Sequence, residues 1–203
     1  YAPQSSTKAM TEEANWEGIT TNTGPGDPSL DVGPNHVVEM LNHGSWGSAV
    51  QIWDKSGTSL LGPSSFSGLA GTTPGGGDPI VLYDERADRW VLTEFSNGGS
   101  SMYVAVSTTP DPTGSYHTYT VNANSFPDYP KYSIWDNSYV ITANEGSTTS
   151  SVYALDRSAL LGGGSGNAQR FTIPRFGTIG FQAGTPISLM GTTVSGGPAL
   201  ICR

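Results

Sequence analysis

The sequence predicts an all-β protein, a β-propeller built from blades of four short strands. Charged residues make up only 13% of the chain, while it holds 27 Gly and 14 Pro, a composition typical of turn-rich β structure. A proline recurs at intervals of 51 residues, at Pro28, Pro79 and Pro130. The residues that follow each proline share one pattern, which indicates a structural repeat.

The first part of each repeat reads as a β-hairpin. After Pro28, two β-rich runs flank a turn and end at Asn42; after Pro130 the same pattern ends at Asn144 without a gap. After Pro79 the turn is two residues longer and the second run ends at Phe95. Two runs joined by a polar turn are typical of a hairpin.

The same register predicts a third and a fourth strand. The third strand ends at Asp54 and Asp156, each 26 residues after its proline, and at Ser107 in the middle repeat. We expect the two Asp side chains to bond the backbone of the outer turn. The fourth strands are predicted at 65–69, 116–121 and 169–173.

A repeat of about 50 residues with four strands is typical of propeller blades. The predicted blades cover 27–70, 78–126 and 128–178, and residues 180–203 supply the first hairpin of a fourth, at Pro186. Residues 1–26 form an N-terminal extension with a candidate closing strand at 16–20. The sequence therefore predicts a partial propeller in 27–203; the alternative is a β-sandwich with accidental spacing.

Charge and hydropathy exclude several classes of partner. A net charge of −8 disfavours nucleic-acid binding, because an acidic surface repels phosphate. No run of 18 apolar residues is present that would predict a membrane span. The only cysteine, Cys202, cannot form a disulfide within the chain. The acidic, Lys-poor and Ser/Thr/Gly-rich composition suggests a secreted or cell-surface bacterial protein.

Several segments resemble a family of secreted bacterial β-propeller proteins, largely uncharacterised. The resemblance covers roughly 16–203, and it implies the propeller fold, secretion and a longer chain but no activity or catalytic residue. The segments that carry it are 31–38, 78–84 followed by Arg89-Trp90, 107–116 and 126–131.

A looser resemblance is to propeller sialidases and glycosidases. Residues 107–116 are similar to the Asp-box turn, in which Ser, Asp, Gly and an aromatic residue cap a blade hairpin. The segment departs from that pattern at Pro110 and Pro112, and it has Tyr116 where Trp is usual. Because Asp boxes are mostly structural, this resemblance supports the fold more than a function.

Asp27, Asp78 and Asp128 each fall just before the first strand of a blade. The innermost strands of a propeller line its channel, so these carboxylates are expected on one face. Together with Glu94 they are the candidate catalytic residues, since glycosidic cleavage needs one protonated and one ionised carboxyl group. The three Asp residues are equally candidate ligands of Ca²⁺. The structural alternative is that Asp before Pro caps a turn.

Candidate ligand-binding residues flank these carboxylates. Asn42, Asn144 and Glu94 are expected at the ends of second strands, near the same face. His43 follows Asn42 and could reach the channel, and Trp46 could stack on a sugar. Trp53, Trp90 and Trp135 are expected to pack between blades.

The leading functional hypothesis is a non-enzymatic binding, adhesion or extracellular assembly module, with Ca²⁺ as a candidate cofactor. The alternative is a carbohydrate-active enzyme that uses the channel-face carboxylates. A glycan is the candidate ligand. Because three blades and a hairpin leave a ring open, we expect the rest of a longer product, or a second chain such as another copy, to complete it.

Overall fold

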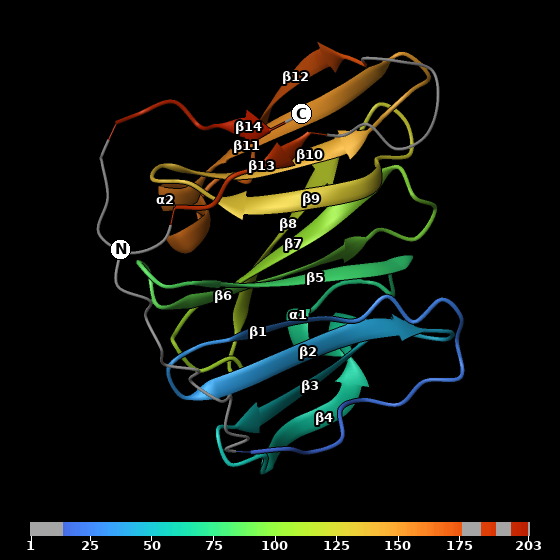
Figure 1. Cartoon of the computed structure of the whole chain (residues 1–203), viewed down its shortest axis with the longest axis vertical. Helices are drawn as coiled ribbons and strands as arrows, with labels where there is room; N and C mark the ends of the chain where they lie inside the picture. The colour runs from blue at the N-terminus through green and yellow to red at the C-terminus, as the bar shows by residue number, and fades with distance from the viewer. Residues whose placement is uncertain (1–13, 176–183, 190–195, 203) are drawn as a thin grey trace, which may run out of the picture.

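The computed structural model describes residues 14–175, 184–189 and 196–202. Three four-stranded antiparallel sheets and one two-stranded sheet follow one another along the chain (Figure 1). Each four-stranded sheet keeps its strands in sequence order, as a propeller blade does. The predicted partial propeller is confirmed, and the sandwich alternative is wrong.

The strands lie close to the predicted positions. The first blade holds β1 (Ser29–Val32), β2 (His36–His43), β3 (Gly47–Asp54) and β4 (Ser59–Ser65). The second holds β5 (Gly77–Asp84), β6 (Arg89–Phe95), β7 (Ser101–Ser107) and β8 (Tyr116–Asn122). The third holds β9 (Asp128–Ile134), β10 (Ser138–Asn144), β11 (Thr149–Asp156) and β12 (Ala168–Pro174). A short hairpin of β13 (Thr185–Pro186) and β14 (Ile201–Cys202) begins the fourth unit.

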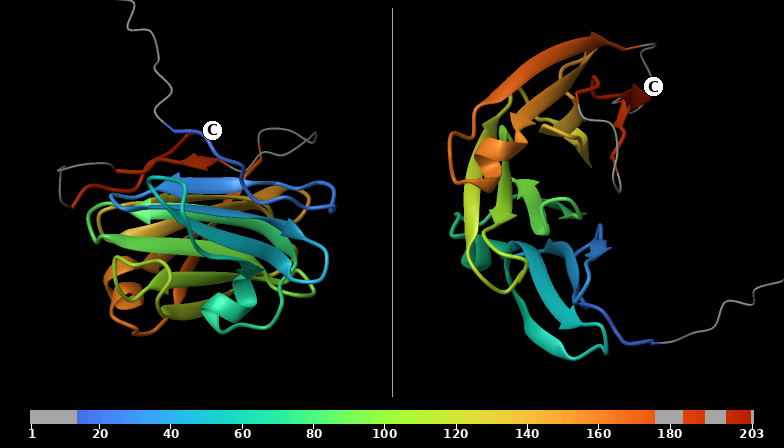
Figure 2. Two further views of the ribbon diagram at one scale, coloured as in Figure 1. Left: turned by 90° about the horizontal axis from the view of Figure 1, so that it is seen from below. Right: turned by 90° about the vertical axis from the view of Figure 1, so that its left-hand side faces the viewer.

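The sheets pack face to face along an arc (Figure 2). One apolar cluster joins the first and second blades through residues such as Met40, Ile52 and Trp90. A second cluster joins the second and third blades, and Trp135 belongs to a third cluster against the fourth unit. Burial of these faces is the main force that holds neighbouring blades together.

Trp53 departs from its predicted place between two blades. It is buried on the far side of the first sheet, in a hollow shared with Trp16 and Leu30. The N-terminal extension therefore covers part of this face. Residues 16–20 are not in a strand in this structure, and their pairing with a last blade stays a prediction. Glu39 fixes the extension instead by accepting a hydrogen bond from the Ile19 N–H (2.9 Å).

The fourth strand of the first blade is also displaced from 65–69. It runs from Ser59 to Ser65 and is followed by α1 (Phe66–Ala70). Ser65 caps this helix by accepting from the Gly68 N–H, and Gly71 ends it in the left-handed region (φ 71°). A second short helix, α2 (Arg157–Leu161), leaves the third blade after β11.

The outer turns behave as expected. The Asp54 carboxylate accepts from the N–H groups of Ser56 and Thr58, and that of Asp156 caps α2 at Ala159. In the Asp-box-like turn the Ser107 hydroxyl accepts from the Trp90 N–H (2.9 Å). These contacts give the motif a structural role.

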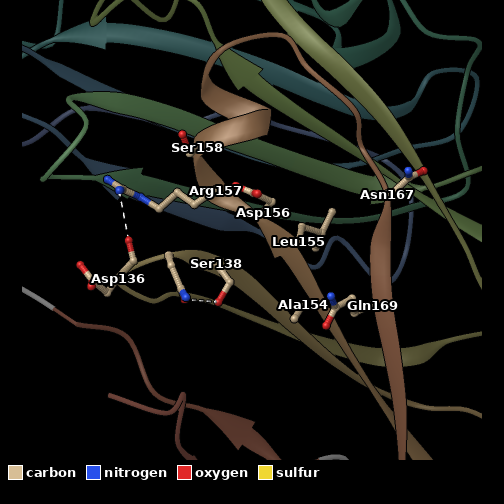
Figure 3. Close-up of a pocket in the computed structure, with 10 residues that line it drawn as sticks. Asp136, Ser138, Ala154, Leu155, Asp156, Arg157, Ser158, Asn167 and Gln169 are labelled. Atoms are coloured by element: carbon tan, nitrogen blue, oxygen red, sulfur yellow. Dashed lines mark hydrogen bonds between the residues drawn. The ribbon is translucent and has the colours of Figure 1, made fainter. Parts of the chain in front are cut away.

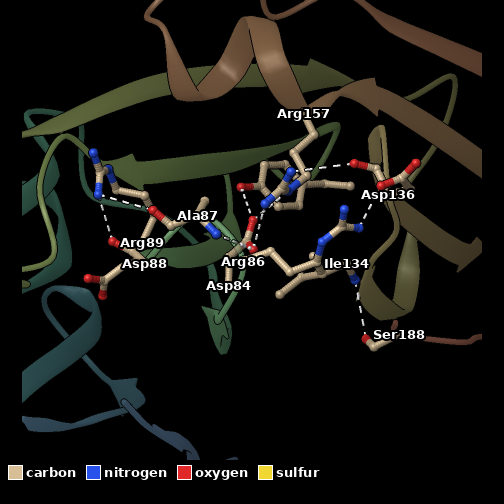
Figure 4. Close-up of polar contacts among 10 residues, drawn as sticks. Asp84, Arg86, Ala87, Asp88, Arg89, Ile134, Asp136, Arg157 and Ser188 are labelled. Carbon is tan, nitrogen blue, oxygen red and sulfur yellow. Dashed lines mark hydrogen bonds and ion pairs between the residues drawn. The ribbon is translucent and has the colours of Figure 1, made fainter. Parts of the chain in front are cut away.

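A buried ion pair ties the second blade to the third (Figure 4). Arg157 at the start of α2 donates two hydrogen bonds to Asp84 at the end of β5, at 2.6 and 2.8 Å. The Tyr139 hydroxyl donates a third at 2.8 Å. Burial opposes ionisation, but these donors hold the pKa of Asp84 below its ordinary value. Nearby, Arg86 forms a more exposed pair with Asp136 at 2.6 Å.

Within the described ranges, no helix has the length and apolar character needed to span a bilayer.

Candidate functional site

The recurrent prolines converge where the innermost strands begin. Pro28, Pro79 and Pro130 line one pocket of about 410 Å³, which we call the channel pocket. Its lining comprises Asp27, Pro28, Ser29, Asp78, Pro79, Ile80, Tyr129, Pro130 and Lys131. The predicted structural equivalence of the prolines is therefore confirmed.

The same irregularity in strand pairing recurs at this pocket. In the second blade, Asp78 and Pro79 lie between the pairs Gly77–Phe95 and Ile80–Thr93, so two residues oppose one. In the third blade, Tyr129 and Pro130 occupy the same place in the pairing of β9 with β10. Proline suits a bulge because it has no N–H to leave unpaired.

The residue before each proline has a backbone conformation that side chains rarely adopt. The φ angles are 42° at Asp27, 52° at Asp78 and 51° at Tyr129. Asp tolerates this region better than most residues, whereas it strains a bulky residue such as Tyr. Such strain costs about 1–3 kcal/mol and concentrates at functional sites. Its repetition at one pocket makes the pocket the candidate site.

Asp27 and Asp78, from neighbouring blades, meet at Asn42. The Asn42 side-chain N–H group donates to Asp27 Oδ2 (2.8 Å) and, at longer range, to Asp78 Oδ1 (3.4 Å). The side-chain oxygen of Asn42, Oδ1, accepts a hydrogen bond from the Asp78 backbone N–H (2.7 Å). Asn42 thus lies at the site, as the sequence predicts, and its role is to hold the carboxylate pair.

The surroundings of Asp78 favour its protonated form. Burial raises the pKa of Asp78, the Asn42 contact lowers it, and the charges of Asp27 and Asp128 raise it further. The carboxyl groups of Asp27 and Asp78 both accept from the Asn42 side-chain N–H group, so they lie side by side. Protonation of Asp78 relieves the repulsion between them.

Asp128 does not take the place that the sequence predicts for it. Tyr129 is the equivalent of Asp27 and Asp78, while Asp128 pairs with Asn144 as Gly77 pairs with Phe95. The Asp128 carboxylate accepts from the Tyr129 N–H (2.9 Å) and acts on Asp78 only through its charge. Alignment of the prolines does not reveal this difference at once, because Asp128 lies two residues before Pro130, whereas Asp27 and Asp78 lie directly before their prolines.

The three Asp residues do not form one ligand set. Among the described residues, no group of three or more His, Cys, Asp or Glu side chains is arranged to hold a metal ion. The calcium hypothesis has two neighbouring carboxyl groups and the Asn42 amide in its favour, and it stays a prediction.

Glu94 differs from its predicted place at the end of a second strand. Phe95 ends β6 and holds the position of Asn42 and Asn144, so Glu94 points to the other face of the sheet. There it is 1% exposed, against the backbone of Gly47 and Gly75. Burial raises its pKa to about 7, although Ser48, Gly75 and Gly77 lie near enough to lower it.

The other ligand-binding candidates divide into two groups. His43 lies beside Asn42, and its ring stacks on that of Trp46 with centroids 4.1 Å apart. His43 lines a separate polar pocket together with Asn42, and neither His43 nor Trp46 lines the channel pocket, so their role in ligand binding stays a prediction. Asn144 is buried in the third blade beside Asp128 and is not part of the Asn42 cluster.

Sequence reasoning missed Tyr129 and Lys131 at the channel pocket. The Tyr129 side chain is 47% exposed, and Lys131 Nζ lies 3.4 Å from the centre of its ring. The alignment of Tyr129-Pro130 with Asp27-Pro28 was the available signal. A charged group over an aromatic face is a cation–π contact, which orients the ring.

A second pocket lies at the opposite end of the third blade, beside the β9–β10 turn (Figure 3). Its volume is about 450 Å³, and Asp136, Ser138 and Arg157 line it. Its charged groups are already paired, Arg157 with Asp84 and Asp136 with Arg86. These pairs join blades, so we assign them a structural role.

No protein-family model matches the sequence, and no curated protein matches it. Among solved structures, the GH43 endo-arabinanase from Bacillus licheniformis is similar, with a TM-score of 0.50 and 14% sequence identity. The similarity covers 82% of this chain but 62% of that one, so the chain spans about three-fifths of the arabinanase.

A GH43 β-1,3-galactosidase also matches, with a TM-score of 0.43, 13% identity, and coverage of 71% of this chain and 34% of that one. At these identities the likeness concerns the fold alone. The chain is an all-β partial propeller whose structural neighbours are GH43 propellers.

Proposed function

We propose that this chain is a carbohydrate-active propeller that binds a neutral glycan at the channel pocket and hydrolyses a glycosidic bond there. The observation that carries the proposal is the pair of carboxyl groups of Asp27 and Asp78, which two blades bring together at the Asn42 amide. The endo-arabinanase and the galactosidase add a precedent for sugars as substrates of this fold.

The lining of the channel pocket suits a sugar. Carboxylate oxygens accept hydrogen bonds from hydroxyl groups, and the Tyr129 ring offers a half-exposed apolar face. The charges of Asp27 and Asp78 repel anionic sugars, and Lys131 in the same lining offsets this repulsion only in part. A volume of about 410 Å³ lies within the range of ordinary ligand pockets.

Hydrolysis requires a proton donor and a separate carboxylate. Asp78 is the candidate acid, because its raised pKa keeps its proton to higher pH. Asp27 lies beside Asp78 at the same Asn42 N–H group, and we assign it to substrate binding rather than to the second role. Asp128 directly precedes Tyr129 of the pocket lining and acts on Asp78 through its charge, so it is the candidate base or nucleophile at the edge of the pocket.

The test is release of reducing ends from a panel of neutral glycans that includes arabinan and galactan. We expect Asp78→Asn to lower the rate by about 10²–10⁴-fold, the usual worth of a general acid, while Glu85→Gln at an exposed turn leaves it unchanged. Loss of activity in Asp128→Asn supports Asp128 as the base or nucleophile. Full activity in both Asp variants would refute hydrolysis at this pocket.

Non-enzymatic glycan binding is the second candidate function. The Asn42 amide favours it, because it holds the carboxyl groups of Asp27 and Asp78 side by side as hydrogen-bond acceptors for sugar hydroxyls. Calorimetric binding that Asp27→Asn weakens, with no release of reducing ends by the wild-type chain, supports this module over the enzyme. The acidic, Lys-poor composition supports an extracellular setting for either function.

A further inference from the structure

A second polar pocket of about 460 Å³ lies at the junction of the first and second blades; we call it the seam pocket. The β2–β3 turn forms one wall and the loop before β5 forms another. Asn42 lines the seam pocket and also holds Asp27 and Asp78 of the channel pocket. Asn42 therefore connects the linings of the two pockets.

Several buried polar atoms around the seam pocket have no hydrogen-bond partner. His43, which lines it, leaves Nδ1 unpaired, and behind the wall Ser48 Oγ and both oxygens of Glu94 are unpaired as well. Each buried polar group without a partner lowers the stability of the folded state by about 1–3 kcal/mol. Of these residues only His43 lines the pocket, so its ring is the polar group that a ligand there can reach, whereas Ser48 and Glu94 lie behind the wall and interact with each other.

Two glycines form the pocket wall in front of Glu94. A Cβ atom on Gly75 would lie within 2.2 Å of Glu94 Oε1, and one on Gly47 within 2.9 Å of Oε2. The Glu94 carboxyl group therefore fills the space beside both glycines. The wall that faces the pocket is backbone, whose N–H and C=O groups can bond hydroxyls.

We propose that the seam pocket is a second sugar subsite, so that the ligand is a neutral oligosaccharide that spans both pockets. The inference rests on the proposed function and adds the class of ligand to it. His43, Ser45 and the backbone at Gly47 supply hydrogen-bonding groups for hydroxyls, and the pocket lining holds no Lys, Arg, Asp or Glu. A neutral chain of two or more sugar units matches this chemistry.

Calorimetry with arabinose and galactose oligosaccharides of one to six units tests the inference. The affinity of the wild-type chain for one series should rise about tenfold or more between one and three units. His43→Ala should remove most of this increase and leave the affinity for the single sugar unchanged. His117→Ala, on the outer strand β8, is the matched control and should behave as wild type.

Ser45→Trp is a second variant, because Ser45 is exposed in the wall and a large side chain there obstructs the pocket without touching the core. It should also abolish the dependence on length. Equal affinity for all lengths would overturn the second subsite but leave the channel pocket intact. Absence of binding to every oligosaccharide would overturn the proposed function itself, and tighter binding of uronic acid oligomers would overturn the neutral class.

Discussion

Replacement of Glu94 by Gln should stabilise the folded protein at alkaline pH and change little at acidic pH. The wild-type carboxyl group is buried, and its pKa rises from 4.5 to about 7. Between these values the folded state keeps a proton that the unfolded chain has released, so the free energy of unfolding falls as pH rises. Gln is neutral throughout and does not show this fall.

The size of the effect follows from the pKa shift. One pKa unit corresponds to about 1.4 kcal/mol, so a rise from 4.5 to about 7 gives about 3 kcal/mol as an order of magnitude. This is the amount by which the unfolding free energy of Glu94→Gln, relative to wild type, should grow between pH 4.5 and pH 8. Most of the change should occur between pH 5 and pH 7.

Urea denaturation followed by tryptophan fluorescence measures this difference at each pH. Glu85→Gln is the control, because Glu85 is exposed in the β5–β6 turn and should give no pH-dependent difference. A Glu94→Gln difference that stays constant from pH 4.5 to pH 8, or that falls, would refute the assignment of a buried, protonated carboxyl group at this position.

Three further predictions concern the blades and the channel pocket. Asp84→Ala should lower the free energy of unfolding by about 3–5 kcal/mol, because it leaves Arg157 without its buried partner. Arg86→Met, at the more exposed pair with Asp136, should lower it by less than about 1 kcal/mol. Equal losses for the two variants in urea denaturation would contradict this. The calcium hypothesis predicts saturable heat on titration of Ca²⁺ into the wild-type chain that Asp27→Asn and Asp78→Asn abolish; heat retained in both variants would place Ca²⁺ elsewhere. Completion of the ring by a second chain predicts sedimentation as a dimer or larger species, and a stable monomer at all concentrations would argue against association of this chain with itself.

The repeat was predictable from sequence because strand pairing imposes it. Each blade needs the same hairpin register, and the bulges near the start of β5 and β9 accommodate a proline, which has no N–H to satisfy. The 51-residue interval therefore identified Pro28, Pro79 and Pro130 as equivalent. The helix after Ser65 was missed because a serine cap and a following glycine also occur in turns.

The candidate site was predictable only in part. Asp27, Asp78 and Asn42 were identified because their places in the repeat put them on one face. Asp128 was misassigned by one position, since composition near Pro130 does not reveal which residue faces the channel. The burial of Glu94 depends on glycines of two different segments, Gly47 and Gly75, and such long-range packing has no local signature in the sequence.

The most direct test of the account is a crystal structure of the chain with the glycan that binds it best. The account predicts electron density for a sugar in the channel pocket, with hydroxyl groups bonded to Asp27 and Asp78 and a ring beside Tyr129. Density for the sugar only at another place, such as the pocket beside Arg157, would contradict the account.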